Sequence, residues 1–258
     1  MRQQSKVKVT VRGKVIGGPS PLICLPLVAK KSDDLLQQAR ELILLQPDLL
    51  EWRIDDYQNV NDVTDCLAVL KELRTAIGDI PLVFTCRIDL EGGLCKITQV
   101  KRLELITAAM DSGNVDIVDI ELCNGQDFIE KVRKSAGINE VKLILSHHNF
   151  SETPDGDFIY NTLLKAQEMG ADIAKLAAMP KKYADVLTLM SATNRARNEG
   201  VQVPMITISM GPEGGISRLA GGLFGSDITF AVGSKSSAPG QIPIADLKTG
   251  MALLYSMD

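Results

Sequence analysis

The sequence predicts an α/β protein in which buried strands alternate with amphipathic helices. Short apolar runs alternate with longer segments of helical spacing along most of the chain. The chain has 258 residues, 45% of them hydrophobic and 23% charged, which is enough to bury a large core. No linker or change of composition divides it. We therefore expect a single domain spanning residues 1–258.

The elements follow one another in a regular order. Residues 7–17, VKVTVRGKVIG, alternate between apolar and polar, which is typical of a β-hairpin, so residues 1–18 are assigned to an N-terminal hairpin. Eight apolar runs then predict strands at residues 22–29, 49–55, 82–87, 115–122, 142–150, 173–180, 205–211 and 228–233.

Segments with helical spacing separate these runs. In residues 32–46, Leu35, Leu36, Ala39, Leu42 and Ile43 form an apolar stripe, and Ser32 is expected to cap the helix. The last helix is expected at residues 245–257. Eight strand–helix units in roughly 250 residues predict a single (β/α)8 barrel of the TIM type. An open doubly wound sheet is the alternative, but no Gly-x-Gly-x-x-Gly follows the first strand, which disfavours its dinucleotide-binding form.

Charge and cysteine content narrow the functional classes. The chain has 28 basic and 32 acidic residues, a net charge of −4, and no long basic run, so a nucleic-acid partner is not expected. The apolar run at residues 21–29 is too short to span a membrane, and the lysines that follow it are on the wrong side for a signal peptide. The cysteines are odd in number and never form a Cys-x-x-Cys pair; they are Cys24, Cys66, Cys86, Cys95 and Cys123. Neither a disulfide framework nor a metal site is expected, and a cytoplasmic location fits best.

Charged side chains interrupt several of the predicted strands. Glu51, Arg53 and Asp55 share one face of their strand, and Arg87 ends the next apolar run. Asp119 and Glu121 share a face in the fourth strand. Each of these residues alone is typical of an ion pair or a solvated strand end. Together they predict a site at the barrel mouth, where catalytic groups of such barrels lie.

Lysine and histidine in the next strands supply candidates for chemistry. Lys175 lies in the apolar run Ile-Ala-Lys-Leu-Ala-Ala, where desolvation favours the neutral amine that a Schiff-base nucleophile needs; a lysine paired with a carboxylate fits the residues equally well. His147 and His148 are adjacent, so alternation allows only one of them to enter the barrel. Ser146 makes the face of His148 the more polar one, which favours His148 as a general base.

Two glycine-rich segments, residues 210–226 and 233–243, follow the seventh and eighth strands. Loops at these positions of a barrel often bind an anion, and Arg218 is suited to hold a carboxylate. Ordinary turn chemistry is the simpler interpretation. Neither segment has a Walker-type ending, so nucleotide phosphate is not favoured.

In this order and spacing, several motifs together resemble type I 3-dehydroquinate dehydratase, a lyase of the shikimate pathway and of aromatic amino acid biosynthesis, over nearly the whole chain. The matching segments are EWRID at 51–55, Arg87 to Glu91 followed by Gly-Gly, VDIEL at 118–122, SHHNF at 146–150, AKLAAMP at 174–180, MGPEGGISRLAGGLFGS at 210–226 and SAPGQI from Ser237. The segment between Arg87 and Glu91 is more apolar than in many relatives. His147 falls at a variable position, so we expect it to have little or no role.

The resemblance implies a cofactor-free, syn dehydration of 3-dehydroquinate to 3-dehydroshikimate by a cytoplasmic homodimer, with no metal. It implies that Lys175 forms the Schiff base, that His148 is the general acid and base, and that Glu91 orients His148. Substrate binding is implied for Glu51, Arg53, Arg87, Arg218, Ser237 and Gln241, with residues 237–241 as a lid. Asp119 and Glu121 would support the surroundings of the lysine.

Two other functions remain open at this point. A class I aldolase would also use a lysine on the sixth strand, but the His148 and Glu91 pair and the charged mouth disfavour it. A non-catalytic barrel that binds a carboxylate is disfavoured because Lys175, His148 and Glu91 are all present. Metal-dependent hydrolysis is even less favoured, since two adjacent histidines on a strand point to opposite faces and cannot bind one metal ion together.

Overall fold

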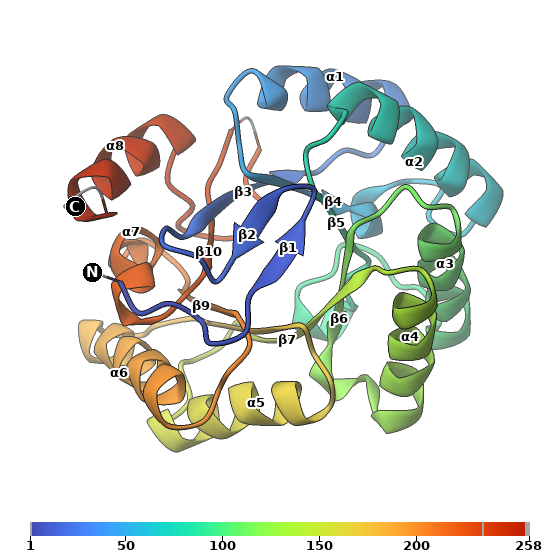
Figure 1. Ribbon diagram of the computed structural model, residues 1–258. Helices are drawn as coiled ribbons and strands as arrows, with labels where there is room; N and C mark the ends of the chain where they lie inside the picture. Colours follow the sequence, from blue (N-terminus) through green and yellow to red (C-terminus); the bar gives the residue numbers. More distant parts are fainter. Residues whose placement is uncertain (1, 234, 256–258) are drawn as a thin grey trace.

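The computed structural model describes residues 2–233 and 235–255, and its main feature is a nearly closed barrel of eight parallel strands surrounded by helices (Figure 1). The strands are β3 (Leu22–Leu27), β4 (Leu49–Arg53), β5 (Leu82–Thr85), β6 (Ile117–Glu121), β7 (Lys142–Asn149), β8 (Ile173–Ala178), β9 (Met205–Ser209) and β10 (Ile228–Phe230). Their order is β10-β3-β4-β5-β6-β7-β8-β9. The seam between β9 and β10 is joined by a hydrogen bond from Asp227 N to Met205 O of 2.6 Å. The predicted TIM-type α/β barrel is confirmed.

Helices follow the strands and cover the outside of the barrel. They are α1 (Ser32–Ile43), α2 (Val63–Ile77), α3 (Gln99–Asp111), α4 (Gln126–Ile138), α5 (Gly156–Glu168), α6 (Tyr183–Glu199), α7 (Gly215–Ala220) and α8 (Ile244–Tyr255). Side chains of Asp62, Thr98 and Asp155 cap α2, α3 and α5. None of the described helices is both long and apolar enough to cross a membrane.

The predicted elements differ from the structure mainly at their ends. The strands are shorter than the apolar runs. The runs at 49–55 and 115–122 end in short 3-10 helices, η1 (Ile54–Asp56) after β4 and η3 (Leu122–Asn124) after β6. The expected cap at Ser32 is wrong: Lys31 is the N-cap residue and makes no side-chain cap bond, and Ser32 is already helical. Positions 256 and 257 of the predicted last helix lie outside the described residues.

The barrel interior is built in layers by the alternation of side chains along the strands. The lowest layer is apolar, with one residue from each strand: Cys24, Leu49, Val83, Ile117, Ile144, Ile173, Ile206 and Ile228. Two residues further along, the inward positions of five neighbouring strands become polar: Glu51, Thr85, Asp119, Ser146 and Lys175. The polar layer therefore rests on an apolar floor.

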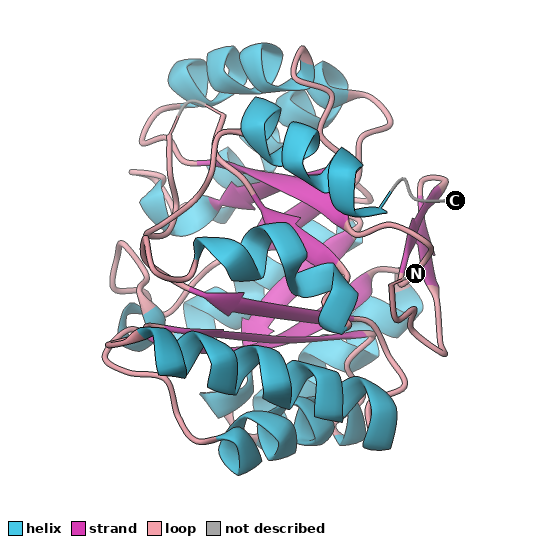
Figure 2. Ribbon diagram, turned by 90° about the vertical axis from the view of Figure 1, so that its left-hand side faces the viewer, coloured by secondary structure: helices cyan, strands magenta, loops and turns pink. Residues whose placement is uncertain are grey.

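A short antiparallel hairpin, β1 (Val9–Val11) and β2 (Lys14–Ile16), closes the end of the barrel where the strands begin (Figure 2). Val9, Val11 and Ile16 pack against the apolar layer. Arg12 and Lys14 form ion pairs with carboxylates that precede the strands β6 and β4. The predicted hairpin is confirmed, and it leaves the opposite end of the barrel open for a site.

Candidate active site

A cavity of about 470 Å³ lies at the carboxyl end of the strands. All nine residues predicted for the site line it: Lys175, His148, Glu91, Glu51, Arg53, Arg87, Arg218, Ser237 and Gln241. They come from strands, from the short helices after strands and from the loop between β10 and α8. The structure thus brings together every residue of the predicted set in one place, at the mouth where barrel active sites lie.

Lys175 projects from β8 into this cavity and is only 5% exposed. Its Nζ donates to Asp119 Oδ2 at 2.7 Å and lies 3.9 Å from Glu51 Oε1. Nζ also lies over the Phe230 ring, 4.7 Å from its centre. The sequence leaves two interpretations of Lys175, a neutral amine or a lysine paired with a carboxylate. The carboxylate partner is present, and the pair is buried in the cavity and does not extend into solvent.

Asp119 is fully buried and is shared between two cations. Its Oδ1 lies 2.9 Å from Arg87 Nη2 and accepts from Ser146 Oγ at 2.6 Å. Burial alone would raise the pKa of Asp119, but Arg87 and Lys175 outweigh it and lower the pKa to about 2. Asp119 therefore stays ionised and pairs with the amine of Lys175.

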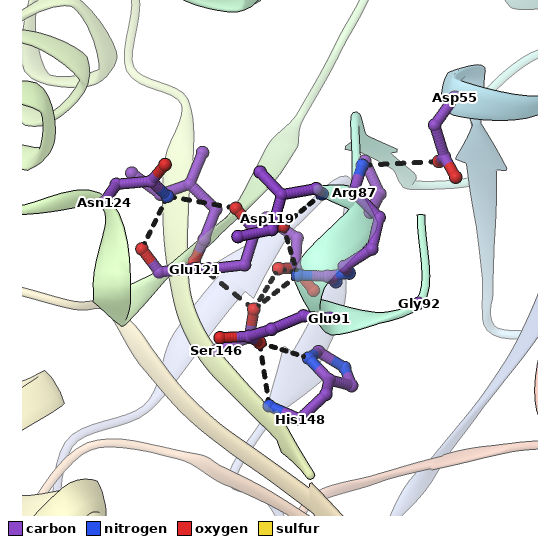
Figure 3. A network of polar contacts seen from close by, with 12 residues as sticks. Asp55, Arg87, Glu91, Gly92, Asp119, Glu121, Asn124, Ser146 and His148 are labelled. Carbon is purple, nitrogen blue, oxygen red and sulfur yellow. Dashed lines mark hydrogen bonds and ion pairs between the residues drawn. The ribbon is translucent and has the colours of Figure 1, made fainter. Parts of the chain in front are cut away.

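His148 lies near the end of β7, next to the strand of Lys175, and Glu91 holds it (Figure 3). Glu91 Oε2 accepts from the His148 backbone N at 2.8 Å and lies 3.0 Å from Nδ1. Because Oε2 accepts the backbone bond, we assign the imidazole proton to Nδ1, which leaves Nε2 with a free lone pair. Burial, followed by the nearby Arg87 and Lys175, holds the pKa of His148 well below its usual range. A neutral imidazole of this kind can accept a proton.

The other oxygen of Glu91 has two neighbours on the outer side. Oε1 accepts a hydrogen bond from the thiol of Cys123 at 3.3 Å and lies 3.8 Å from Nδ1 of His147. Burial raises the pKa of Glu91 to about 7. His147 itself packs on Phe158 and does not line the cavity, in agreement with the expected alternation of the two histidines.

Three charged residues predicted for substrate binding, Arg87, Arg53 and Glu51, line the cavity at the ends of β4 and β5. Arg87 donates through Nη1 to Glu121 Oε1 at 2.8 Å and to Ser146 Oγ at 2.7 Å. Arg53 forms a bidentate pair with Asp55, at 2.9 and 2.8 Å. Thr85 donates to Glu51 at 2.9 Å. Each group is fixed from behind, so its position does not depend on a ligand.

Arg218 differs from these arginines because it has no carboxylate partner among the described residues. It is 2% exposed and donates only to two backbone oxygens, of Phe230 at 3.2 Å and of Pro239 at 2.9 Å. Its Nε has no hydrogen-bond partner, and burial lowers its pKa to about 10. A buried cation without a counter-ion at a cavity wall is suited to bind an anionic group.

The loop between β10 and α8 places Ser237 and Gln241 at the cavity. Gln241 Oε1 accepts from the Ser237 backbone N at 3.1 Å, and its Nε2 donates to Ser237 Oγ at 3.2 Å. Pro239 O accepts from Gly211 N at 3.2 Å, so this loop rests on the loop after β9. The loop covers one side of the cavity and joins it to Arg218.

Several residues of the site were not predicted from the sequence. The apolar part of the cavity wall consists of Phe150, Ala177, Ile208, Met210, Phe230 and Ala238. Periodicity identified most of these only as strand or core residues, since an apolar side chain gives no signal that separates a core from a cavity wall. Cys123 gave no signal either, because its bond to Glu91 joins the ends of two different strands.

Within the residues that the structure describes, no three His, Cys, Asp or Glu side chains gather as metal ligands. The expectation that the reaction needs no cofactor stays a prediction. The cavity combines a buried amine, a neutral imidazole held by a carboxylate, and an arginine free to bind an anion. This set can form an imine with a ketone, remove a proton beside it and hold a carboxylate.

Comparison with known proteins gives the same result from the sequence side. A family model described as type I 3-dehydroquinase matches residues 23–258. A 3-dehydroquinate dehydratase from Geobacillus thermodenitrificans is 43% identical over 251 residues, 97% of each chain. Another from Albidiferax ferrireducens is 42% identical over 97% of this chain and 96% of its own length.

Solved structures agree in the fold. The crystal structure of 3-dehydroquinate dehydratase from Geobacillus kaustophilus superposes with a TM-score of 0.97 at 43% identity and covers all of both chains. The type I enzyme from Clostridium difficile, described with covalently modified comenic acid, has a TM-score of 0.94 at 40% identity and covers 98% of this chain and 99% of its own.

Proposed function

Because the chain belongs to the type I 3-dehydroquinase family and is a 3-dehydroquinate dehydratase, we propose that it removes water from 3-dehydroquinate through an imine on Lys175, without a cofactor. The observation that carries this mechanism is that Lys175, the Glu91-held His148 and the unpaired Arg218 all line one cavity. A substrate whose carboxylate is bound at Arg218 would have its ketone in the same small cavity as the Lys175 amine and the His148 imidazole.

The reaction begins when Lys175, which is paired with Asp119, passes a proton to His148 Nε2 and its free amine attacks the substrate ketone. His148 returns the proton to the carbinolamine hydroxyl, which leaves as water as the protonated imine forms. The protonated imine withdraws electrons from the neighbouring carbon, so the proton on that carbon becomes acidic. His148 Nε2 removes it, and the electron pair moves into an enamine. Glu91 stabilises the imidazolium that results, since its Oε2 lies 3.0 Å from Nδ1.

Elimination follows from the same imidazolium. The enamine electrons expel the hydroxyl on the adjacent carbon, and His148 supplies the proton that makes it a water molecule. Use of one imidazole for both transfers requires the proton and the hydroxyl to leave from the same face, which gives syn stereochemistry. Water then hydrolyses the imine with help from His148 and releases 3-dehydroshikimate; the net change is the loss of one water.

Substrate recognition is proposed for the six remaining residues of the predicted set. Arg218, Ser237 and Gln241 would bind the carboxylate and close the lid, while Glu51, Arg53 and Arg87 would face the ring hydroxyls. Lid closure would exclude water from the imine. Asp119 would keep the amine aimed into the cavity.

The family resemblance and the composition also support three proposals about the whole protein: a single domain over residues 1–258, a cytoplasmic location, and a homodimer that does not bind nucleic acid. Light scattering that gave a mass of one chain would overturn the dimer.

Borohydride trapping tests the covalent route. We expect a substrate- or product-sized adduct on Lys175 after reduction with sodium borohydride in the presence of 3-dehydroquinate, detected by intact-mass and peptide mass spectrometry. Lys175→Ala should lose both the adduct and turnover. His148→Ala should still form an adduct, since it keeps the amine, but its kcat should fall by about 100-fold or more, the usual scale for a general acid–base.

The variants also separate the mechanisms. A folded enzyme that turns over substrate but gives no adduct would exclude the imine route. An adduct mapped to another lysine, or full activity in Lys175→Ala, would assign the nucleophile elsewhere. Carbon–carbon cleavage of the substrate would favour an aldolase.

A further inference from the structure

Arg102 is a buried arginine that does not line the cavity but reaches toward it from outside the barrel. It lies in α3 and is 1% exposed. Its Nη2 forms an ion pair with Glu121 Oε2, and its Nη1 donates to Asn124 Oδ1 at 2.8 Å. The guanidinium lies over the Phe128 ring of α4, 5.1 Å from its centre. These contacts fix the cation in one position.

Glu121 divides its two oxygens between this arginine and Arg87 of the cavity wall. Figure 3 shows Glu121 with its neighbours Arg87 and Asn124. Oε1 accepts from Arg87 Nη1 at 2.8 Å and from the Ile88 backbone N at 3.2 Å. Oε2 accepts from Arg102 and, at 3.0 Å, from Asn124 Nδ2. Glu121 is fully buried, so solvent cannot compensate its charge, and the two arginines share this role.

Arg87 in turn is the link between Glu121 and the reacting lysine. Its Nη2 lies 2.9 Å from Asp119 Oδ1, and Asp119 Oδ2 holds Lys175 Nζ at 2.7 Å. The charges therefore alternate from α3 into the cavity, in the order Arg102, Glu121, Arg87, Asp119 and Lys175. Without Arg102, Glu121 Oε2 would keep only the Asn124 amide, and the excess negative charge would attract Arg87 away from Asp119 and from the cavity wall.

We propose that Arg102 is a positioning residue, which acts through Glu121 to hold the guanidinium of Arg87 in place for substrate. The inference rests on the proposed role of Arg87 in substrate binding. The proposal assigns a function to a helix residue outside the cavity. The carboxylate of Glu121, which both arginines share, transmits the effect of Arg102 to Arg87. A residue that acts on a binding group and not on the reacting atoms should change KM more than kcat.

Three substitutions at position 102 test this role. Arg102→Met and Arg102→Gln remove the charge, and Gln keeps a hydrogen-bonding group. Both should raise KM for 3-dehydroquinate roughly tenfold, while kcat changes less than about threefold. A tenfold effect is the scale found when a residue that hydrogen-bonds to a metal-ligating side chain is replaced. Arg102→Lys restores the charge and should return KM most of the way. If Arg102→Met does not fold, the difference in KM between Arg102→Gln and Arg102→Lys tests the proposal.

Arg197 provides a matched control at the other end of the barrel. It is a buried helix arginine, 4% exposed, paired with the fully buried Asp227 at 2.6 Å. Arg197→Gln should destabilise the protein in a similar way but leave KM unchanged. An equal rise of KM in both variants, or no rise in a folded Arg102→Gln, would overturn the inference.

A double-mutant cycle with Arg87→Ala identifies the route. If Arg102 acts through Arg87, Arg102→Gln should raise KM in the wild type but add nothing in the Arg87→Ala background. The same rise of KM in both backgrounds would show that Arg102 acts by another route. This result would overturn the inference about Arg102 but not the proposed function. An unchanged KM in Arg87→Ala itself would instead remove the proposed binding role of Arg87.

Discussion

Glu91 carries two tasks that oppose each other at the scale of a single residue. In the proposed mechanism its carboxylate must be ionised to support the imidazolium of His148, yet its burial beside the cavity disfavours the charge and raises its pKa to about 7. Proteins often keep such unfavourable groups at sites of function, where the cost in stability is offset by the chemistry. The site of this enzyme therefore contains a measurable source of instability.

The effect of Glu91 on stability depends on pH with a definite sign. Because its pKa is higher in the folded state than in the unfolded chain, the folded state binds the proton more tightly, and stability falls as pH rises from about 4.3 to 7. A carboxyl whose pKa is raised from about 4.3 to about 7 makes the ionised folded state less stable by about 4 kcal/mol. Glu91→Gln removes this titration. We expect the free energy of unfolding of the variant, relative to the wild type, to increase by up to that amount between pH 5 and pH 8, while kcat falls.

Urea unfolding at several pH values measures this difference. Glu104→Gln, at an exposed glutamate of α3, is the control and should show no such trend. If the difference in free energy of unfolding between Glu91→Gln and the wild type did not change with pH, Glu91 would titrate as an ordinary carboxyl. The conflict between protein stability and the proposed role of Glu91 would then not exist.

At the scale of elements, the loop between β10 and α8 packs closely against the loop after β9 at Gly240. Gly240 has φ +74°, and a Cβ at this position would lie 2.0 Å from Gly211 O. Its neighbour Pro239 accepts hydrogen bonds from Gly211 and Arg218. A side chain at position 240 would therefore push the lid loop away from both the loop after β9 and the arginine.

Gly240→Ala should lower kcat/KM by about 10- to 100-fold, since small displacements of positioned groups have effects of this size. The matched control is Gly78→Ala at the end of α2, where φ is +57° but no atom lies within 4 Å of the added carbon. Both variants have the strain of a positive φ, so both should lose at least about 1 kcal/mol of stability, but only Gly240→Ala should lose activity. Equal kcat/KM in the two variants would show that the lid loop does not depend on this contact.

The elements and their inward faces could be predicted from the sequence because both depend on local periodicity. The alternation of Glu51 and Arg53, or of Ser146 and His148, fixes which side chains share a face, and the order of strands then brings those faces together. Pairings between strands could not be predicted in the same way. Asp119 was assigned to the lysine only through the family resemblance, and nothing in the sequence pairs Glu121 with Arg102, because such contacts depend on register and on helix placement. The cap expected at Ser32 failed because the helix begins one residue earlier than the cap pattern requires.

At the scale of the whole molecule, the two ends of the barrel have different tasks. The carboxyl end of the strands holds the polar cavity, and the amino end is closed by the hairpin and by ion pairs. The most deeply buried of these is centred on Asp227, which is fully buried, pairs with Arg2 and Arg197, and accepts from the Met205 backbone N at 2.7 Å. It joins the N-terminal segment, α6 and the seam between β9 and β10.

Asp227→Asn should therefore destabilise the protein without altering its chemistry. The substitution leaves two buried cations without a counter-charge, and removal of one partner from a buried ion pair costs about 3–5 kcal/mol. We expect the free energy of unfolding in urea to fall by this amount, with kcat and KM unchanged in conditions where the variant is folded. Asp116→Asn is the comparison: Asp116 also pairs with two arginines at this end, but its side chain and that of Arg12 are 11% and 29% exposed, so water can compensate and the loss should be smaller. If Asp227→Asn changed KM while folded, the seam would be coupled to the cavity and the two ends of the barrel would not be separate in function.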